Sequence, residues 1–350
     1  MTTTVPAGAS APAAGRRVTP TARLVLPADA DRDVWLLARR NGIGSSDAAG
    51  ILGVSDDDYS NPLRVYLDKL GELIDDAGQP AYWGNVFEEP VAREWARRNR
   101  SVVRRVGLVA HQDEPWMRAT LDRRITECPL PEAGREACAL EVKTRSAFKA
   151  RSWHTGAPDD VLAQVLWQMA VTGYRHMHYA VVIGGNDYRQ GVVRADAHTR
   201  VTADIITAVR RFWEDNVLAR VRPPHTGNPE RLVEMYRRQH PERDGVVHLD
   251  RVDGAHDALV DYEQARLAEA AARRRKTAAQ AEMLRNLGPA QTAALGNDRA
   301  YSLEPTERSS CDLERLAERW PEAYSDCVRT TRSERLDIDP RFRLKPSKEA

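Results

Sequence analysis

Two separate stretches of this chain hold acidic and basic side chains at a spacing that could bind a metal ion. One is the run Leu140-Glu141-Val142-Lys143, and the other is the end of an apolar stretch at Asp122. Because side chains on a strand alternate between its two faces, Glu141 and Lys143 would share one face and the two apolar residues the other. An antiparallel pairing of the two stretches would bring Asp122 close to Glu141. Two adjacent carboxylates repel each other, and a divalent cation relieves that repulsion.

The chemistry that follows from such a pair is metal-assisted attack on a phosphate ester. Carboxylate oxygens are hard ligands that suit Mg²⁺, for which Mn²⁺ can substitute. An ammonium group such as Lys143 beside the cation could orient the attacking water. The same residues also have an ordinary structural interpretation. A Glu-x-Lys strand is commonly an exposed charge pair, and Asp122 followed by Arg123 and Arg124 is commonly a turn with a surface ion pair. The local spacing alone leaves both interpretations open.

The four cysteines of the chain form no metal-binding motif that can be recognised from spacing. Cys128, Cys138, Cys311 and Cys327 include no Cys-x-x-Cys pair, and none has a histidine at the usual ligand spacing. We therefore expect neither a zinc site nor an iron–sulfur site. A few unpatterned cysteines also suit a reducing cytoplasm.

Composition restricts the class of protein without identifying a function. The chain has 350 residues of which 42% are hydrophobic, which is enough for one large core or two modest ones. Charged residues make up 29% and the net charge is +1, which excludes a uniformly basic coat but not a local basic channel. No apolar run is long enough to span a bilayer, and the N-terminal segment lacks the order of a signal peptide. The sequence therefore indicates a cytoplasmic protein with no membrane partner.

Periodicity and capping residues predict an alternation of helices and strands around these side chains. Helices are expected over residues 31–40, 48–52, 61–71 and 82–100. Strands are expected next over residues 102–111, 116–122 and 137–143. A helix over 161–172, a strand pair over 179–183 and 191–194, and a helix over 201–217 follow. This order predicts an α/β fold in which a mixed central sheet is flanked by helices.

The composition also predicts three regions along the chain. Residues 1–22, rich in Thr, Ala, Pro and Ser, are expected to be a flexible segment. Residues 23–224 would form the α/β domain, because the composition changes after Pro223-Pro224. Residues 225–350 would be a helical region with one long charged helix or a helical hairpin over 256–287, a short strand over 299–303 and a basic tail over 341–350.

Five blocks in a fixed order place the chemical residues in a wider pattern. The blocks are Gly42–Asp47, Trp83–Val91, Asp122, Leu140–Thr144 and Ala163–Gly173. In this order they resemble the YqaJ-like viral recombinase family, which is similar to the phage lambda exonuclease and has the PD-(D/E)xK, restriction-endonuclease-like fold. The resemblance extends from about Arg40 to Gly185.

The resemblance implies a role for each matching position. Glu88 corresponds to a helix carboxylate that binds metal beside the scissile phosphate, with Glu89 as the neighbouring alternative. Asp122 and Glu141 correspond to the metal-bridging pair. The remaining correspondences are the main-chain carbonyl of Val142 as an extra metal ligand, Lys143 as the water-activating lysine and Gln164 as a helix glutamine that touches the site.

Two regions are candidates for contacts with DNA. Ser45 and Ser46 correspond to a loop that approaches the 5′ end of the strand in such enzymes, although these residue types also cap helices. Arg123 stands where the family usually has the glycine of a Pro-Asp-Gly turn, so the turn must differ here. Arg123 and Arg124 could contact phosphates instead, and Arg145, after the catalytic strand, is a further phosphate candidate.

The resemblance implies a phage- or prophage-type exonuclease in a bacterial host cell. The family degrades linear double-stranded DNA from free 5′ ends and leaves 3′ overhangs for a single-strand annealing protein, and relatives form ring-shaped homotrimers. Two alternatives stay open. One is an endonuclease or structure-specific nuclease of the same superfamily. The other is a catalytically silent DNA-binding or scaffold protein, for which the altered turn at Arg123 is the main support. The basic run Arg273–Lys276 could grip DNA, mediate assembly or lie in solvent.

Overall fold

The chain divides into two compact units, which are described separately. The computed structural model describes residues 15–55, 60–73, 78–130, 137–224, 229–239, 242–307, 310–329 and 339–344. The first unit is Met1–Arg243 and the second is Asp244–Ala350. The first unit thus continues beyond the composition change at Pro224 and includes α7 (Pro229–Gln239), whose Leu232 is buried in the main core.

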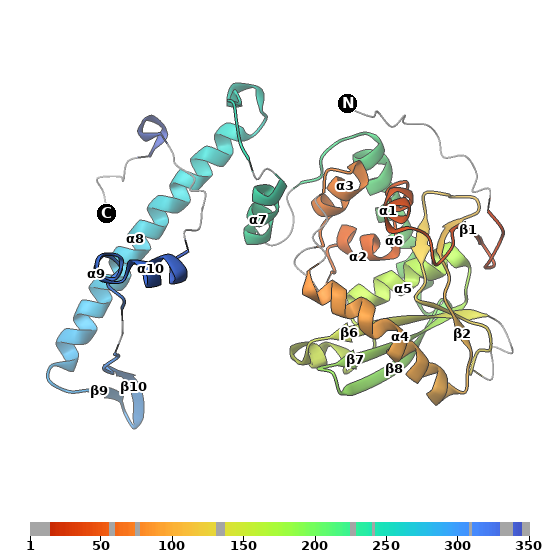
Figure 1. The fold of residues 1–350 in the computed structure, drawn as a ribbon, viewed down its shortest axis with the longest axis horizontal. Coiled ribbons are helices and arrows are strands. Elements are labelled where there is room, and N and C mark those ends of the chain that lie inside the picture. The colour runs from red at the N-terminus through yellow and green to blue at the C-terminus, as the bar shows by residue number, and fades with distance from the viewer. Residues whose placement is uncertain are drawn as a thin grey trace. The chain divides into compact units, whose positions relative to one another are not determined.

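A five-stranded sheet forms the centre of the first unit (Figure 1). In spatial order its strands are β2 (Val103–Arg104), β5 (Arg123–Ile125), β6 (Cys138–Arg145), β7 (His176–Ile183) and β8 (Asp187–Arg194). Neighbouring strands are antiparallel except β6 and β7, which are parallel. A parallel pair needs a crossover connection. Here it consists of the 3₁₀ segment η2 (Ala147–Trp153) and helix α5 (Asp159–Thr172).

A smaller antiparallel sheet lies at the start of the first unit. Its order is β1 (Ala22–Leu26), β3 (Leu108–His111) and β4 (Arg118–Thr120). Strand β4 passes into β5 through Leu121 and Asp122 alone. Asp122 therefore lies where the chain leaves one sheet and enters the other.

Helices cover both faces of the central sheet (Figure 1). On one face α4 (Gln79–Asn99) buries Trp95 with Ile125 and Leu140. On the other face α5 buries Trp167 in the core that includes Met177. The helices that complete this second layer are α1 (Arg32–Arg40), α2 (Ser45–Ile51), α3 (Pro62–Leu70), α6 (Thr199–Arg211), the 3₁₀ turn η3 (Asp196–His198) and the π-helical η4 (Phe212–Leu218). This mixed central sheet flanked by helices is the α/β class that the sequence predicted.

The expected single strand over residues 102–111 is wrong, because it is two strands in two different sheets. Gly107 lies between β2 and β3, where the chain runs against the end of β1. A Cβ atom at this position would lie 1.7 Å from the carbonyl oxygen of Leu26, so the approach requires glycine. The expected strand over 116–122 likewise ends at Thr120, and β5 follows as a separate strand. Strand β7 begins at His176 rather than at residue 179.

The expectation that residues 1–22 form a flexible segment is wrong for its last residues, which are held in place. The main-chain N–H of Thr21 donates to the carbonyl of Thr172 at 3.1 Å, and its hydroxyl donates to the carbonyl of Val171 at 2.9 Å. Ala22 is fully buried. These contacts fasten the chain before β1 to the end of α5. Residues 1–14 lie outside the described part of the chain.

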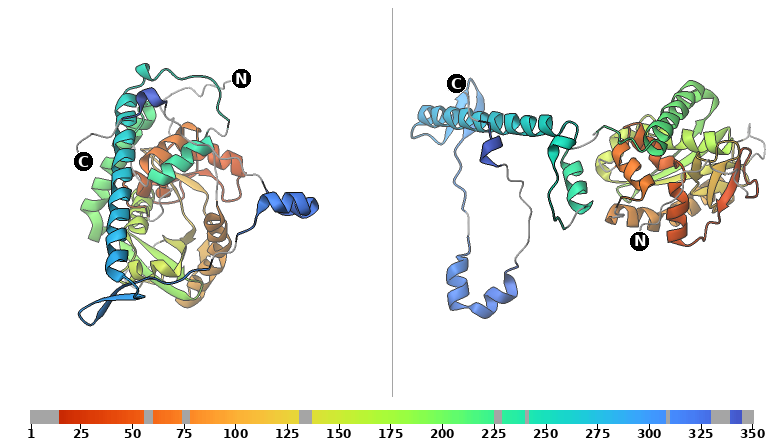
Figure 2. Two further views of the ribbon diagram at one scale, coloured as in Figure 1. Left: turned by 90° about the vertical axis from the view of Figure 1, so that its left-hand side faces the viewer. Right: turned by 90° about the horizontal axis from the view of Figure 1, so that it is seen from above.

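The second unit is built on one long helix, which decides between the two expectations of a single helix and a helical hairpin. Helix α8 spans Ala255–Leu287 and stops at Gly288, and Figure 2 shows it without interruption. The hairpin of β9 (Thr292–Leu295) and β10 (Asp298–Ser302) follows, of which only the second strand was expected. The other elements are α9 (Leu313–Arg319), α10 (Pro321–Cys327) and the 3₁₀ turns η5 (Leu249–Arg251) and η6 (Pro340–Phe342). Of the expected basic tail, residues 345–350 lie outside the described residues. Among the described helices, none combines the length and the apolar character needed to cross a lipid bilayer.

Candidate active site

The acidic residues singled out in the sequence lie together where β5 begins and β6 passes it. Arg123 of β5 pairs with Leu140 of β6, so Asp122 faces Glu141 in the antiparallel register. The Asp122 carboxylate accepts a hydrogen bond from the main-chain N–H of Val142 at 2.7 Å. Burial raises the pKa of Asp122 well above its usual range, and the negative charges of Glu141 and Glu88 raise it further. The positive charge of Lys143 lowers this pKa but does not outweigh the other causes. Carboxylates from three segments of the chain therefore lie close enough to influence one another.

Glu141 is fully buried, and both of its oxygens are held by neighbouring side chains. Lys143 donates to Oε1 at 2.5 Å, and Gln164 donates to the same oxygen at 2.6 Å. Gln168 donates to Oε2 at 2.8 Å. Lys143 also donates to the Gln164 side-chain oxygen at 2.8 Å, which closes a network of these groups.

Two helix glutamines thus belong to the site, and only one of them was predicted. Gln164 and Gln168 are four residues apart on α5, so they lie on the same helix face and point at the same carboxylate. The sequence predicts no role for Gln168. Its four-residue spacing from Gln164 is the signal that could have identified it.

Arg123 is not available to DNA phosphates, which corrects one predicted contact. Its side chain is buried and its guanidinium forms ion pairs with Glu88 and with Glu89, the latter at 2.5 Å. Because residues alternate along β5, Arg124 points the other way, toward Tyr174. There burial raises the pKa of the Tyr174 hydroxyl and the nearby Arg124 charge lowers it. Neither arginine therefore extends from the site as the sequence suggested.

The Ser45–Asp47 segment forms the first turn of α2. Asp47 accepts a hydrogen bond from the main-chain N–H of Gly44 at 2.8 Å and pairs with buried Lys69 at 2.5 Å, so this carboxylate caps and anchors the helix. Ser46 is exposed and accepts from Arg39 at 3.2 Å. The hydroxyl of Ser45 is buried and has no hydrogen-bond partner among the described residues.

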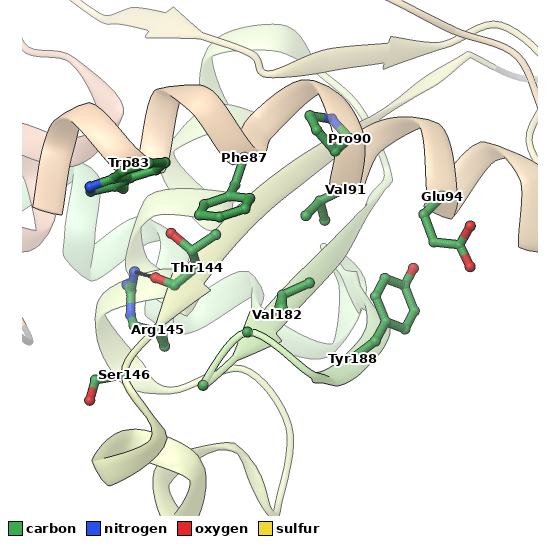
Figure 3. Close-up of a pocket in the computed structure, with 12 residues that line it drawn as sticks. Trp83, Phe87, Pro90, Val91, Glu94, Thr144, Arg145, Ser146, Val182 and Tyr188 are labelled. Carbon is green, nitrogen blue, oxygen red and sulfur yellow. Dashed lines mark hydrogen bonds between the residues drawn. The ribbon is translucent and has the colours of Figure 1, made fainter.

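Arg145 borders a cavity of about 520 Å³ at the end of β6 (Figure 3). Its guanidinium donates to Asp160 at 2.8 Å. Trp83 and Phe87 project from α4 into the same cavity, with ring centroids 5.7 Å apart, and each is about half exposed. The cavity begins one residue beyond Lys143, at Thr144. The sequence did not predict this aromatic surface next to the acidic cluster.

The acidic cluster fits a hard divalent cation. Its donors are the carboxylates of Glu88, Asp122 and Glu141, and carboxylate oxygens are ligands that Mg²⁺ and Mn²⁺ prefer. Three carboxylates face the two positive groups of Arg123 and Lys143, which leaves an excess of negative charge. A divalent ion would neutralise that excess.

A second group of side chains could hold a metal ion, although the spacing of the cysteines along the chain did not indicate one. Cys128, Cys138, His176 and His178 converge, and their sulfur and nitrogen atoms all lie within 4.8 Å of one another. Burial lowers the pKa of His178 to about 4, helped by His176 and Arg194, so its imidazole is neutral at neutral pH. The sequence signal was the His-x-His pair, because alternation on a strand puts both rings on one face. The cysteines lie far upstream, so spacing along the chain could not reveal them.

The chain is similar to one protein family and to several known proteins. Residues 34–175 match the model of the YqaJ-like viral recombinase domain. The chain is 27% identical over 317 residues to "Uncharacterized protein YqaJ" of Bacillus subtilis (strain 168), over 88% of this chain and 94% of that protein. The alkaline exonuclease LHK-Exo of Laribacter hongkongensis aligns with 18% identity and a TM-score of 0.44, over 54% of this chain and 94% of that one. Its complex with dAMP gives a TM-score of 0.42.

Proposed function

Because residues 34–175 form a YqaJ-like viral recombinase domain, we propose that the chain is a Mg²⁺-dependent deoxyribonuclease that degrades linear double-stranded DNA from its ends. The polarity is 5′ to 3′, and the product is a 3′ overhang that serves recombination by single-strand annealing. The proposal includes action in the bacterial cytoplasm, an annealing protein as partner and a homo-oligomer, a trimer in the related enzymes.

This proposal rests mainly on one observation. The carboxylates of Glu88, Asp122 and Glu141 lie close together beside the ammonium group of Lys143. Glu88, Asp122 and Glu141 would hold Mg²⁺, with the carbonyl of Val142 as a further ligand. When bound, Mg²⁺ would neutralise the carboxylates and stabilise negative charge on the phosphoryl group. Mn²⁺ could replace it, because both ions prefer oxygen ligands.

The side chains around the carboxylates would orient the reacting groups. An ammonium group has three N–H donors. Among the described residues, Lys143 gives two of them to Glu141 and Gln164, which leaves one for the attacking water or a phosphate oxygen. Gln164 and Gln168 fix both oxygens of Glu141, so the carboxylate enters the reaction already positioned. Such prepositioning lowers the cost of reorganisation in the transition state.

Substrate DNA would lie across the mouth of this site. We assign Ser45 and Ser46 to strand contacts on the strength of the family resemblance, and Arg145 because it is a cationic side chain just after the strand that carries Glu141 and Lys143. Arg145 has structural support, because it borders the cavity that Trp83 and Phe87 line. Flat aromatic rings beside a cationic side chain suit a nucleobase and its phosphate.

The experiment compares linear duplex DNA carrying 5′-phosphates with a closed circle, in Mg²⁺ or EDTA. We expect mononucleotides from the linear DNA only, no product in EDTA, and no product from Lys143→Ala. Lys149→Ala is the matched control, because it removes the same charge from an exposed position after β6. It should keep kcat and change only the affinity for DNA. End-labelled duplex identifies the strand that is shortened.

Two other results of this experiment would support an endonuclease or a catalytically silent DNA-binding protein. Cleavage of the closed circle would replace the exonuclease proposal with an endonuclease. The ion pairs of Arg123 with Glu88 and Glu89 favour a catalytically silent DNA-binding protein as the second candidate, because they occupy a carboxylate that the metal would need. Binding without cleavage of either DNA, in both Mg²⁺ and Mn²⁺, would establish that candidate instead.

A further inference from the structure

Two cysteines and two histidines meet on the sheet face opposite Glu141. The Cys128 sulfur lies 3.1 Å from Nε2 of His176 and 3.4 Å from Nε2 of His178. The Cys138 sulfur completes the group, and all four ligand atoms lie within 4.8 Å of one another. Both cysteines are free thiols in the structure.

The strand register explains why these four side chains converge. Cys138 is the first residue of β6 and His176 the first of β7, and the pairing of Ala139 with Met177 puts them side by side. His178 follows on the same face, because alternate residues of a strand share a face. Cys128 follows β5 and reaches the same end of the sheet.

The side chains around the group are packed rather than open to solvent. Cys138 is fully buried, and His176 and His178 are about 5% and 4% exposed. The ring of Trp95 on α4 meets the ring of His178 edge-on, with centroids 5.0 Å apart. Cys128 is half-buried, and four protein ligands would leave no coordination position for a substrate, which is the usual arrangement of structural rather than catalytic zinc.

We propose that Cys128, Cys138, His176 and His178 bind one Zn²⁺ ion tetrahedrally. Zinc–sulfur bonds of about 2.3 Å and zinc–nitrogen bonds of about 2.0–2.1 Å put the sulfur and nitrogen of a tetrahedral site about 3.5 Å apart. The two distances from Cys128 lie close to that value. Two thiolates and two neutral imidazoles would also balance the charge of Zn²⁺, so the buried site would carry no net charge.

The geometry favours one ion over a two-iron cluster. A Cys₂His₂ two-iron cluster holds its cysteines on one iron and its histidines on the other. The sulfur and nitrogen ligands then stand on opposite sides of the cluster. Here Cys128 lies within contact distance of both imidazoles, which leaves room for a single ion between them.

The ion would stabilise the strands that carry the acidic cluster. It would join the connection after β5 to the first residues of β6 and β7. Strand β5 starts next to Asp122, and Glu141 lies three residues beyond Cys138 on β6. A zinc ion here would therefore fix the register of these strands without touching the substrate. This inference does not depend on the proposed nuclease activity.

The first test measures metal in the full chain, purified under reducing conditions without chelator. Elemental analysis should find one zinc per chain. An organomercurial, which binds thiolates, should release that zinc, whereas zinc held by carboxylates would stay. The Asp122→Asn variant should keep the zinc, because its site lies on the other sheet face. Replacement by Co²⁺ should give the visible absorption of a tetrahedral cobalt–thiolate centre.

Matched variants locate the ligands. Cys128→Ser and His176→Gln should lose the zinc and the cobalt absorption, while Cys311→Ser and Cys327→Ser should keep both. If the ligand variants fail to fold, the wild-type measurements still decide the question. Wild-type protein with free thiols, no zinc and no cobalt absorption would overturn the proposal. Iron with acid-labile sulfide, or a Cys128–Cys138 disulfide found by thiol titration, would overturn it as well.

Discussion

At the residue scale, Arg123 is the side chain that most changes the interpretation of the acidic cluster. Its guanidinium neutralises Glu88 and Glu89 from a buried position. A residue that looked like a phosphate contact is therefore part of the charge balance around Asp122. Arg123 also replaces a glycine in the family pattern, so its removal tests whether the chain depends on this balance.

We expect Arg123→Gly to destabilise the metal-free protein by about 1–3 kcal/mol, the usual range for leaving a buried charged group without its partner. The loss falls below that of a fully buried pair, because Glu88 and Glu89 stay partly exposed. Mg²⁺ should restore more stability in the variant than in the wild type, because an ion that binds only the folded state stabilises it. Thermal unfolding with and without Mg²⁺ measures this difference. An equal Mg²⁺ effect in both proteins would contradict the prediction.

Asp47 gives a pH-dependent prediction away from the metal. Burial raises the pKa of its carboxyl, but Arg39 and Lys69 outweigh burial and hold the pKa well below the ordinary 3.8. A lowered folded-state pKa stabilises the protein above the unfolded pKa, and this stability is lost as pH falls through the folded value. Asp47→Asn should therefore cost about 3 kcal/mol at pH 7, as for a broken buried ion pair.

The pH dependence of unfolding separates the loss of the Asp47 ion pairs from poor packing of the asparagine side chain. The stability difference between wild type and Asp47→Asn should shrink as the pH falls below 3.8. Urea unfolding from pH 7 to the acid limit of folding measures it. A difference that stays constant over this range would mean that the asparagine merely packs poorly. Asp68→Asn is a matched control, because Asp68 is the more exposed partner of the same Lys69.

At the element scale, the sequence was sufficient to predict a helix or strand where a local pattern of residues determines it. Alternation along β6 placed Glu141 and Lys143 on one face, and capping and periodicity located the helices. It was insufficient where distant segments meet. The split between β2 and β3 depends on how closely Gly107 approaches Leu26, and the histidine pair meets Cys138 only through the parallel register of β6 and β7. Neither contact can be predicted from the spacing of residues within one segment of the sequence.

Helix α4 carries both a metal-site carboxylate and an aromatic surface, which links two parts of the proposed DNA path. Trp83 lies on this helix about half exposed, at the cavity beside β6. Stacking of one base on an aromatic side chain contributes about 1–3 kcal/mol. Trp83→Ala should therefore weaken binding of single-stranded DNA by roughly tenfold to a hundredfold, with about 1.4 kcal/mol for each factor of ten.

Fluorescence anisotropy in EDTA measures this affinity without cleavage. Trp320→Ala is the control, because it removes an equally exposed tryptophan from the second unit. Its affinity should equal that of the wild type. If both variants bind DNA as the wild type does, the cavity has no role in holding bases.

At the scale of the whole molecule, all the groups of the acidic cluster lie in the first unit. The chain truncated after Arg243 should therefore fold and cleave a short linear duplex in Mg²⁺, because it keeps the two sheets of the first unit and the helices of that unit. Helix α8 bears the Arg273–Lys276 run, and its loss should reduce affinity for long DNA or change the molar mass in solution. Cleavage assays and light scattering measure these effects. A truncated chain that fails to fold would mean that the units are not independent.

The parallel pairing of β6 with β7 has a consequence for biosynthesis. It joins segments separated by η2 and the whole of α5, and such non-local pairing raises contact order and slows folding. On the ribosome, β6 is synthesised before the glutamines of α5 and the histidines of β7. A nascent chain that ends before α5 has Glu141 without the two glutamines that hold it. The central sheet around Glu141 can therefore be completed only after β7 has been synthesised.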